Sequence, residues 1–150
     1  MITIKTGDLL SATEDIIGHQ VNCFGAAGGL AYHVFNKWPD AKNDYMHLVT
    51  RLKMKKALLG MAQLTGQQKD GHIIANIYGQ YQPGADYRPD ALEKALAMLG
   101  EEARTMNCSV ALPYGISCGI AGGDWNEVLQ IIERTMKDVD CAIYRREGDV

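Results

Sequence analysis

The sequence of 150 residues has no apolar run that approaches the roughly 20 residues of a membrane span. Its start, MITIKTGDLL, lacks the charged opening and the long apolar middle of a signal peptide. No block of roughly five or more like charges occurs, and the net charge is −3. We therefore expect a cytoplasmic protein with no membrane partner, and nucleic acid is not an expected partner either.

Motifs for metal and nucleotide chemistry are missing as well. The four cysteines, Cys23, Cys108, Cys118 and Cys141, show neither CxxC nor CxH spacing. We expect them to be reduced and mostly buried, without a zinc site or a disulfide framework. Neither the GxxxxGK[ST] of P-loop NTPases nor the GxGxxG of standard dinucleotide folds occurs. The sequence thus predicts no metal and no cofactor.

Apolar runs of strand length alternate with helical patterns along the chain. The apolar content is 47%, and 150 residues suffice for one domain with a real core. Strands buried on both faces have continuous apolar sequences, as these runs do. Together with the alternation of strands and helices, this pattern predicts a single α/β domain over residues 1–150. We expect a central mixed sheet with helices on both faces, in three layers. The expected strands are 2–5, 16–22, 61–65, 72–78, 109–113 and 141–146, and the expected helices are 31–38, 40–52, 92–103 and 125–138.

Residues suited to an anionic ligand follow some of these strands. GD at 7–8 follows the first expected strand, NCFGAAGG at 22–29 follows the second, and GISCGIAGGD at 115–124 follows the fifth. The last two precede helices, where backbone N–H groups and the helix dipole attract anions. Ligands of open α/β sheets lie beyond the carboxyl ends of strands. The loops together indicate a diphosphate site, although each alone is equally compatible with a tight turn.

The segments TGDLL, GHQVNCFGAAGGLAYHVFNKWPDAKNDY and LPYGISCGIAGGDW, in this order, resemble those of a macrodomain. The resemblance covers nearly the whole chain. It is closest to the branch that includes the terminal ADP-ribose protein glycohydrolase and the ADP-ribose-1″-phosphate phosphatase. It implies a three-layer α/β/α macrodomain whose ligand is ADP-ribose or a derivative, and an ADP-ribosylated protein is a further candidate partner.

The resemblance implies roles for the residues of these loops. Asp8, with the backbone of Leu9, would recognise the adenine amine, although an aspartate there also fits a turn cap. Tyr144 would border the adenine or be an ordinary strand tyrosine. The residues that would line the distal ribose and one phosphate are Gly28, Gly29 and Leu30. Those that would wrap the diphosphate are Ser117, Cys118, Gly119, Ile120, Ala121 and Gly122.

Asn22, His19 and Asp124 are the candidate catalytic residues. The resemblance implies that Asn22 faces the distal ribose, where its amide would donate hydrogen bonds to and accept them from the ribose hydroxyls. An asparagine at the end of a strand can equally form hydrogen bonds within its own loop. Strand alternation sets His19 on the face opposite Asn22, which favours a core histidine. Asp124 is a candidate to replace a catalytic acid that this chain lacks. However, DWNE is also a capping box, with Asp124 as N-cap and Glu127 at N3, and we favour this interpretation.

The chain departs from the family pattern where the glycohydrolase carries its catalytic lysine and aspartate. Tyr78 and Ala121 stand at those positions. The turn within 22–31 is one residue shorter than usual and lacks one glycine. Covalent capture of the sugar by a lysine amine therefore does not carry over. In the longer loop, Tyr81, Tyr87 and Arg88 either cover the substrate or are solvated.

The activity that the resemblance implies is hydrolysis of an ADP-ribose derivative at its distal ribose. The candidate substrates are ADP-ribose 1″-phosphate, an ADP-ribosyl carboxylate ester on protein, and O-acetyl-ADP-ribose. The alternative is a non-catalytic reader module that binds ADP-ribose, which the missing lysine and aspartate favour.

Overall fold

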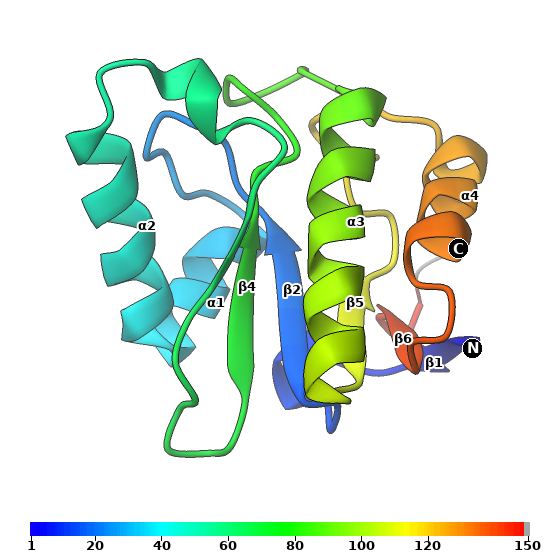
Figure 1. The fold of residues 1–150 in the computed structure, drawn as a ribbon. Helices are drawn as coiled ribbons and strands as arrows, with labels where there is room; N and C mark the ends of the chain where they lie inside the picture. Colours follow the sequence, from blue (N-terminus) through cyan, green and yellow to red (C-terminus); the bar gives the residue numbers. More distant parts are fainter. Residues whose placement is uncertain (149–150) are drawn as a thin grey trace.

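The computed structural model describes residues 1–148 and contains a six-stranded sheet with helices on both faces (Figure 1). The strands are β1 (Ile2–Thr6), β2 (Ile16–Gln20), β3 (Ala62–Leu64), β4 (Ile73–Ile77), β5 (Val110–Pro113) and β6 (Cys141–Arg145). The helices are α1 (Leu30–Lys37), α2 (Pro39–Arg51), α3 (Pro89–Met106) and α4 (Trp125–Thr135), with short 3₁₀ helices η1 (Leu9–Ser11) and η2 (Lys55–Leu58). The predicted three-layer mixed α/β fold is confirmed.

Parallel pairing dominates the sheet. The strand order is β1-β6-β5-β2-β4-β3, and β3 pairs antiparallel with β4 while the other neighbours are parallel. The parallel strands therefore end at one edge of the sheet. The segments that follow β1, β2, β4 and β5 share this edge, which positions the candidate site.

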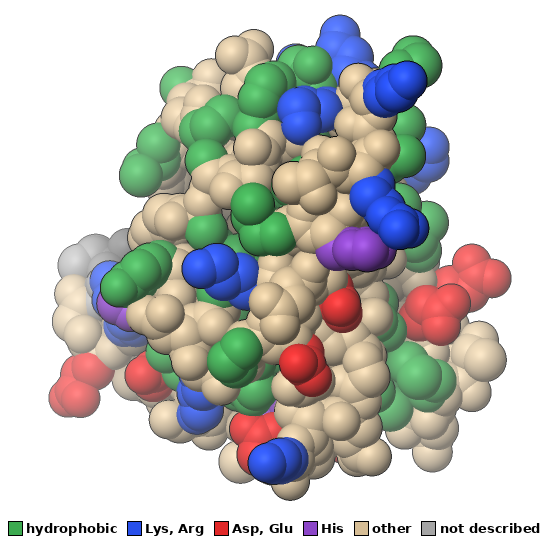
Figure 2. All heavy atoms as spheres, turned by 90° about the vertical axis from the view of Figure 1, so that its left-hand side faces the viewer, with side chains coloured by type: hydrophobic (Ala, Val, Ile, Leu, Met, Phe, Trp, Pro, Cys, Tyr) green, Lys and Arg blue, Asp and Glu red, His purple; other side chains and the backbone are tan. Residues whose placement is uncertain are grey.

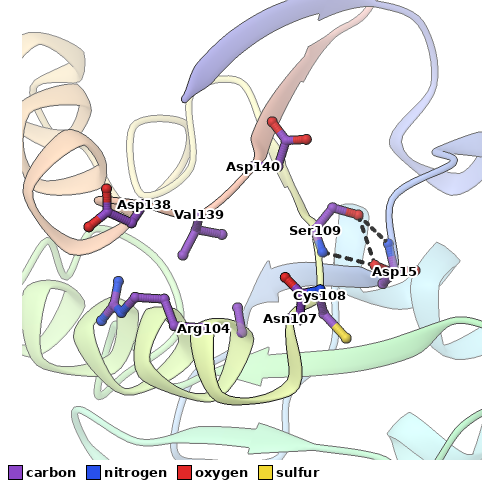
Figure 3. Close-up of a pocket in the computed structure, with 9 residues that line it drawn as sticks. Asp15, Arg104, Asn107, Cys108, Ser109, Asp138, Val139 and Asp140 are labelled. Carbon is purple, nitrogen blue, oxygen red and sulfur yellow. Dashed lines mark hydrogen bonds between the residues drawn. The ribbon is translucent and has the colours of Figure 1, made fainter.

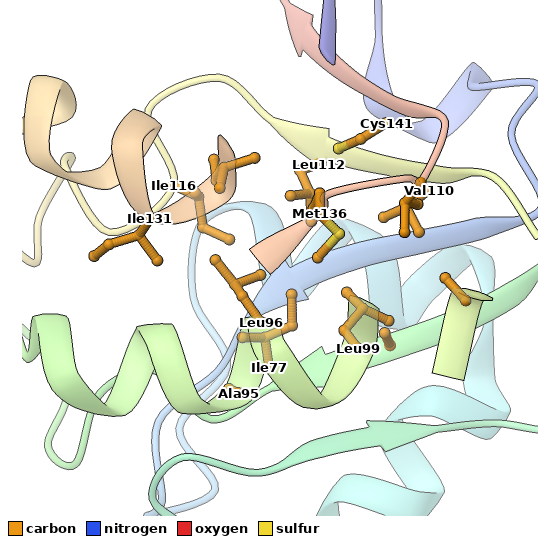
Figure 4. Packing of buried hydrophobic residues seen from close by; sticks show 14 of the residues in the cluster. Ile77, Ala95, Leu96, Leu99, Val110, Leu112, Ile116, Ile131, Met136 and Cys141 are labelled. Carbon is orange, nitrogen blue, oxygen red and sulfur yellow. The ribbon is translucent and has the colours of Figure 1, made fainter. Parts of the chain in front are cut away.

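Two hydrophobic cores join the layers. One lies between the sheet and the pair α3 and α4, where Leu96 and Leu99 meet Ile131 and Met136 (Figure 4). The other lies between the opposite face of the sheet and the pair α1 and α2, and it includes Phe35 among its buried side chains. Because β2 is covered on both faces, its residues are buried from Ile16 to His19. This burial explains why the strand reads as one apolar run.

Differences from the sequence prediction lie at element ends. Helix α2 begins at Pro39 rather than at residue 40, because the first helical position needs no backbone N–H. Strand β2 ends at Gln20 rather than at 22, and α4 ends at Thr135 rather than at 138. The two 3₁₀ helices are new, since a single turn has no apolar period to detect. All four cysteines are free thiols, and no helix within residues 1–148 has the length and apolarity to cross a membrane.

Gly100 allows helix α3 to pack closely against the end of helix α4. A Cβ there would lie 2.2 Å from the backbone oxygen of Thr135. We expect Gly100→Ala to lower the free energy of unfolding by about 2 kcal/mol, since overpacking costs up to about 3 kcal/mol and alanine's helix propensity returns about 1 kcal/mol. Urea denaturation measures the change. Gly66→Ala, where a Cβ meets nothing within 4 Å, is the control and should leave stability unchanged.

Candidate functional site

The loop between β5 and α4 carries backbone N–H groups without partners. Across residues 1–148, the N–H groups of Ser117, Gly119, Ile120 and Ala121 donate no hydrogen bond. The loop is nevertheless ordered, because Gly123 N donates to Ser117 O at 2.8 Å. Ser117 itself has a left-handed backbone with φ 65°. Unpaired N–H groups on a fixed loop beside a helix start can bind an anion.

Two glycines at this edge are required neither by packing nor by their backbone conformation. A Cβ at Gly28 or at Gly119 would meet nothing within 4 Å, and neither residue has a positive φ. Gly29 and Gly122 differ, because their φ angles of 55° and 84° favour glycine whatever lies nearby. Glycine at 28 and 119 is compatible with close approach of an external group to the backbone.

Helix α1 begins without a side-chain cap. Its N-cap residue is Gly29, which has no side chain to accept from the first N–H groups. Leu30, the first helical residue, is partly exposed, with 36% of its surface open. The start of α1 thus resembles the β5–α4 loop in offering N–H donors to an external acceptor.

Asn22 organises its own loop. Its Oδ1 accepts hydrogen bonds from Phe24 N and Tyr45 Oη, both at 2.9 Å, and from Ala26 N at 3.4 Å. Its Nδ2 donates to Ala26 O at 2.7 Å. With 7% of its surface exposed, Asn22 has one amide hydrogen left for another partner. The interpretation that Asn22 bonds its own loop is confirmed, and a contact with ribose stays a prediction.

Asp8 and Tyr144 lie together near the ends of β1 and β6. Asp8 Oδ1 accepts from Leu10 N at 2.9 Å and caps η1, as the alternative interpretation expected. Its second carboxylate oxygen forms no hydrogen bond within the described chain. The Tyr144 ring lies beneath Gly7, where a Cβ would be 3.8 Å away, and its hydroxyl donates to Glu14 Oε1 at 2.7 Å. Leu9 is buried in the core.

His19 and Asp124 are both engaged elsewhere. His19 is fully buried, its Nε2 lies 2.7 Å from Asn76 Oδ1, and burial lowers its pKa to about 4. It is therefore a neutral core histidine, as strand alternation predicted. Asp124 caps α4 by accepting from Asn126 N at 3.0 Å, which confirms the N-cap. Glu127 does not complete the capping box, because it instead accepts a hydrogen bond from the Tyr87 hydroxyl.

No family model matches the chain, but the fold and sequence have clear relatives. The macrodomain of Mycobacterium tuberculosis DarG superposes with a TM-score of 0.84 at 29% identity, covering 96% of this chain and 97% of that one. This chain is a macrodomain.

Curated relatives of this macrodomain carry two names. A DNA ADP-ribosyl glycohydrolase of Mycobacterium tuberculosis is 30% identical over 156 residues, which cover 99% of this chain and 43% of that protein. The chain thus spans less than half the length of this relative. An ADP-ribose 1″-phosphate phosphatase of Saccharomyces cerevisiae is 23% identical, and the match covers 96% of this chain and 98% of the relative.

Tyr78 is a buried structural residue of the macrodomain. Its hydroxyl donates to Gln63 Oε1 at 2.8 Å, and burial raises its pKa well above the ordinary value. Ala121, the other departure, is buried in the β5–α4 loop. Burial also raises the pKa of the Cys118 thiol to about 11, so this cysteine is not a ready nucleophile.

Gln20 is a site residue that sequence reasoning missed. The Ser117 hydroxyl donates to Gln20 Oε1, and Gln20 Nε2 donates to Gln80 Oε1 at 2.7 Å. Gly79 makes room for this side chain, since a Cβ there would lie 2.3 Å from Gln20 Oε1. Gln20 thus joins the β5–α4 loop to the segment after β4. The signal in the sequence was a glutamine at the end of a buried strand.

A polar cavity of about 450 Å³ lies at the opposite edge of the sheet (Figure 3). It is lined by Asp15, Arg104, Cys108, Asp138 and Asp140 among others, near the starts of β2, β5 and β6. Asp15 Oδ2 accepts from Ser109 N at 2.9 Å, so part of this lining is already paired. Among the residues described, no cluster of histidine, cysteine and acidic side chains is arranged to hold a metal ion.

Proposed function

We propose that this macrodomain binds ADP-ribose and hydrolyses an ADP-ribose derivative at its distal ribose. The observation that carries the proposal is the set of unpaired N–H groups on the β5–α4 loop, beside a glycine that neither packing nor φ requires. A diphosphate needs such donors close to the backbone. The relatives named for ADP-ribose chemistry support the same ligand.

The ligand would span the edge from β1 to α1. Adenine would lie near Tyr144, with its amine donating to the carboxylate oxygen of Asp8 that is not used in capping. The diphosphate would accept from the N–H groups of the β5–α4 loop, and the distal ribose would reach Gly28 and the uncapped start of α1. Asn22 would donate its remaining amide hydrogen to the ribose.

The reaction would be direct attack of water on the distal ribose or on its ester group. The leaving group would be a phosphate, a carboxylate, or, by analogy with the mycobacterial relative, a group of DNA. Because His19 is buried in the core and Asp124 caps α4, the substrate's own phosphate would orient the water. The protein would contribute fixed N–H donors and a fixed ribose.

The reader module remains the second candidate, and specific observations favour it. His19 is inaccessible in the core, Asp124 caps α4, and Tyr78 replaces the lysine of the glycohydrolase. A protein that keeps the diphosphate cradle without these groups would bind ADP-ribose and release it unchanged. Hydrolysis assays on the candidate esters, ADP-ribose 1″-phosphate and ADP-ribosylated DNA separate the two functions.

Calorimetric titration with ADP-ribose, with AMP and ADP as controls, tests binding. Asp8→Asn keeps the capping oxygen but replaces the second oxygen by an amide that repels the adenine amine. We expect it to weaken ADP-ribose binding roughly tenfold or more, because a hydrogen bond to a charged group contributes about 1.5–3 kcal/mol. Stability should be unchanged. Absence of ADP-ribose binding by the wild type would refute the proposed function.

The two glycines without an internal role give a sharper test. Gly28→Ala and Gly119→Ala are each expected to weaken ADP-ribose binding about tenfold or more, equal to about 1.4 kcal/mol, because the added methyl group occupies the space of the ligand. Thermal stability should not fall. Gly66→Ala, equally open but on the β3–β4 turn, is the matched control and should bind normally. Normal binding by both site variants would mean that no ligand approaches these positions.

A further inference from the structure

One short segment contacts both loops of the proposed phosphate site. We call residues 80–88, which follow β4, the bracing segment. Cys23 N, in the β2–α1 loop, donates to Tyr81 O at 2.9 Å. The Tyr87 ring packs against the end of the β5–α4 loop, where a Cβ on Gly123 would lie 2.6 Å from Tyr87 Cδ1. The bracing segment therefore links the two loops to each other.

A chain of side-chain hydrogen bonds joins the bracing segment to the start of the β5–α4 loop. Gln80 Nε2 donates to two carbonyl oxygens of its own segment, Gln82 O at 2.6 Å and Gly84 O at 3.3 Å. Because a carbonyl oxygen can only accept, Gln80 turns its Oε1 toward Gln20, whose Nε2 donates to it at 2.7 Å. Gln20 Oε1 then accepts from the Ser117 hydroxyl. The direction of each bond is thus fixed, and the hydroxyl hydrogen of Ser117 is committed to Gln20.

This hydrogen bond acts on a residue with an unfavourable backbone. Ser117 has a φ of 65°, in the left-handed region that costs free energy for any residue with a Cβ. A left-handed residue in such a turn lets successive N–H groups face one concave space, which is an anion-binding geometry. Ser117 is buried, so its bond to Gln20 forms largely away from water. The bond therefore stabilises the backbone conformation on which the unpaired N–H groups of the loop depend.

Charge alone would not align a diphosphate with these N–H groups. On the face shown in Figure 2, the upper half displays lysine and arginine side chains among hydrophobic ones, and the acidic side chains lie in the lower half. The upper end is the one at which β2 and β4 finish in Figure 1. Such a distribution attracts an anion to this end of the molecule but does not orient it. Affinity then depends on how firmly the N–H donors are held in place.

We infer that Gln20 and Gln80 are positioning residues, which hold the β5–α4 loop in its diphosphate-binding conformation through Ser117. The inference rests on the proposed function, because it states what keeps that site preorganised. Neither glutamine needs to touch the ligand. Tyr87 holds the far end of the same loop, and its hydroxyl donates to Glu127 of α4. Without the two glutamines, the N–H groups would still be present but would no longer converge.

Calorimetric titration of Gln20→Ala and Gln80→Ala with ADP-ribose tests the pair. We expect each variant to bind about fivefold more weakly, the factor that corresponds to one neutral hydrogen bond. The double variant should lose no more than either single one, because the bonds act in series. Gln130→Ala is the matched control, since Gln130 is an exposed glutamine on α4, and it should bind normally.

Amide nuclear magnetic resonance spectra of the free proteins separate positioning from a general loss of stability. In Gln20→Ala and Gln80→Ala, the amide signals of residues 117–122 should broaden or shift, whereas those of residues 31–37 in α1 should stay in place. Ser117→Gly removes the hydroxyl but also relieves the left-handed φ. It should therefore stay within a few degrees of the wild-type melting temperature and still bind ADP-ribose about fivefold more weakly.

Three results would overturn the inference and leave the proposed function standing. They are normal ADP-ribose affinity in both glutamine variants, additive losses in the double variant, and signals of residues 117–122 that match the wild type. If the wild type bound no ADP-ribose, the proposed function would fail instead. The amide spectra need no ligand, so they would still decide whether Gln20 and Gln80 hold the loop.

Discussion

Replacing Asn22 by alanine is expected to lower the free energy of unfolding by about 2–4 kcal/mol. The substitution leaves the Ala26 carbonyl and the Phe24 N–H each short of a partner, and an unsatisfied buried polar group costs about 1–3 kcal/mol. Urea denaturation followed by tryptophan fluorescence measures the loss. Because the side chain holds the turn at 23–26, ADP-ribose affinity should fall in the same variant.

Asn43→Ala is the matched control for this substitution. Asn43 is exposed on α2, so its replacement should leave both stability and binding near the wild-type values. Asn22→Asp keeps the acceptor for Phe24 N but cannot donate to Ala26 O, and it should lie between wild type and Asn22→Ala. A stable Asn22→Ala protein that fails to bind ADP-ribose would instead assign Asn22 to the ligand alone.

Acidification from pH 6.5 to about 4 is expected to remove up to about 3 kcal/mol of stability through His19. Burial lowers the pKa of this histidine from 6.5 in the unfolded chain to about 4 in the folded protein. The unfolded state therefore binds a proton in this range that the folded state excludes. The contribution is complete above pH 6.5 and is lost as the pH falls toward 4, at about 1.4 kcal/mol for each pKa unit.

Denaturation curves across this range give the measurement, and His19→Gln should remove the slope that His19 causes. His33→Gln is the control, because His33 is exposed on α1. The comparison belongs above pH 4.5, since carboxylates such as Glu14, whose pKa is lowered by its contacts with Lys5 and Tyr144, add their own loss below it. An unaltered slope in His19→Gln would show that the ring does not stay neutral in the core.

Much of this fold could be predicted because its signals are local. Continuous apolar runs indicated the buried strands, and Pro39 marked the boundary between α1 and α2. The edge with the glycine-rich loops followed from the parallel order of the strands. Helix η2 could not be predicted, because its four residues bury a single side chain, Leu58, and show no period.

The candidate site was predicted less completely because its contacts are distant in sequence. Ser117 and Gln20 are 97 residues apart, and nothing in either segment announces their hydrogen bond. Lys56 and Tyr81 come together only once η2 packs near the segment after β4.

The position of β1 has a consequence for the order of folding. This first strand lies at the edge of the sheet and pairs with β6, with Ile2 opposite Cys141. The N-terminal ammonium group also donates to Val139 O at 2.7 Å. During synthesis, β1 therefore has no partner until β6 has also been made. Closing so long a loop is slow, so we expect the β2–β4 region to form first and the β1–β6 pair to complete the sheet late.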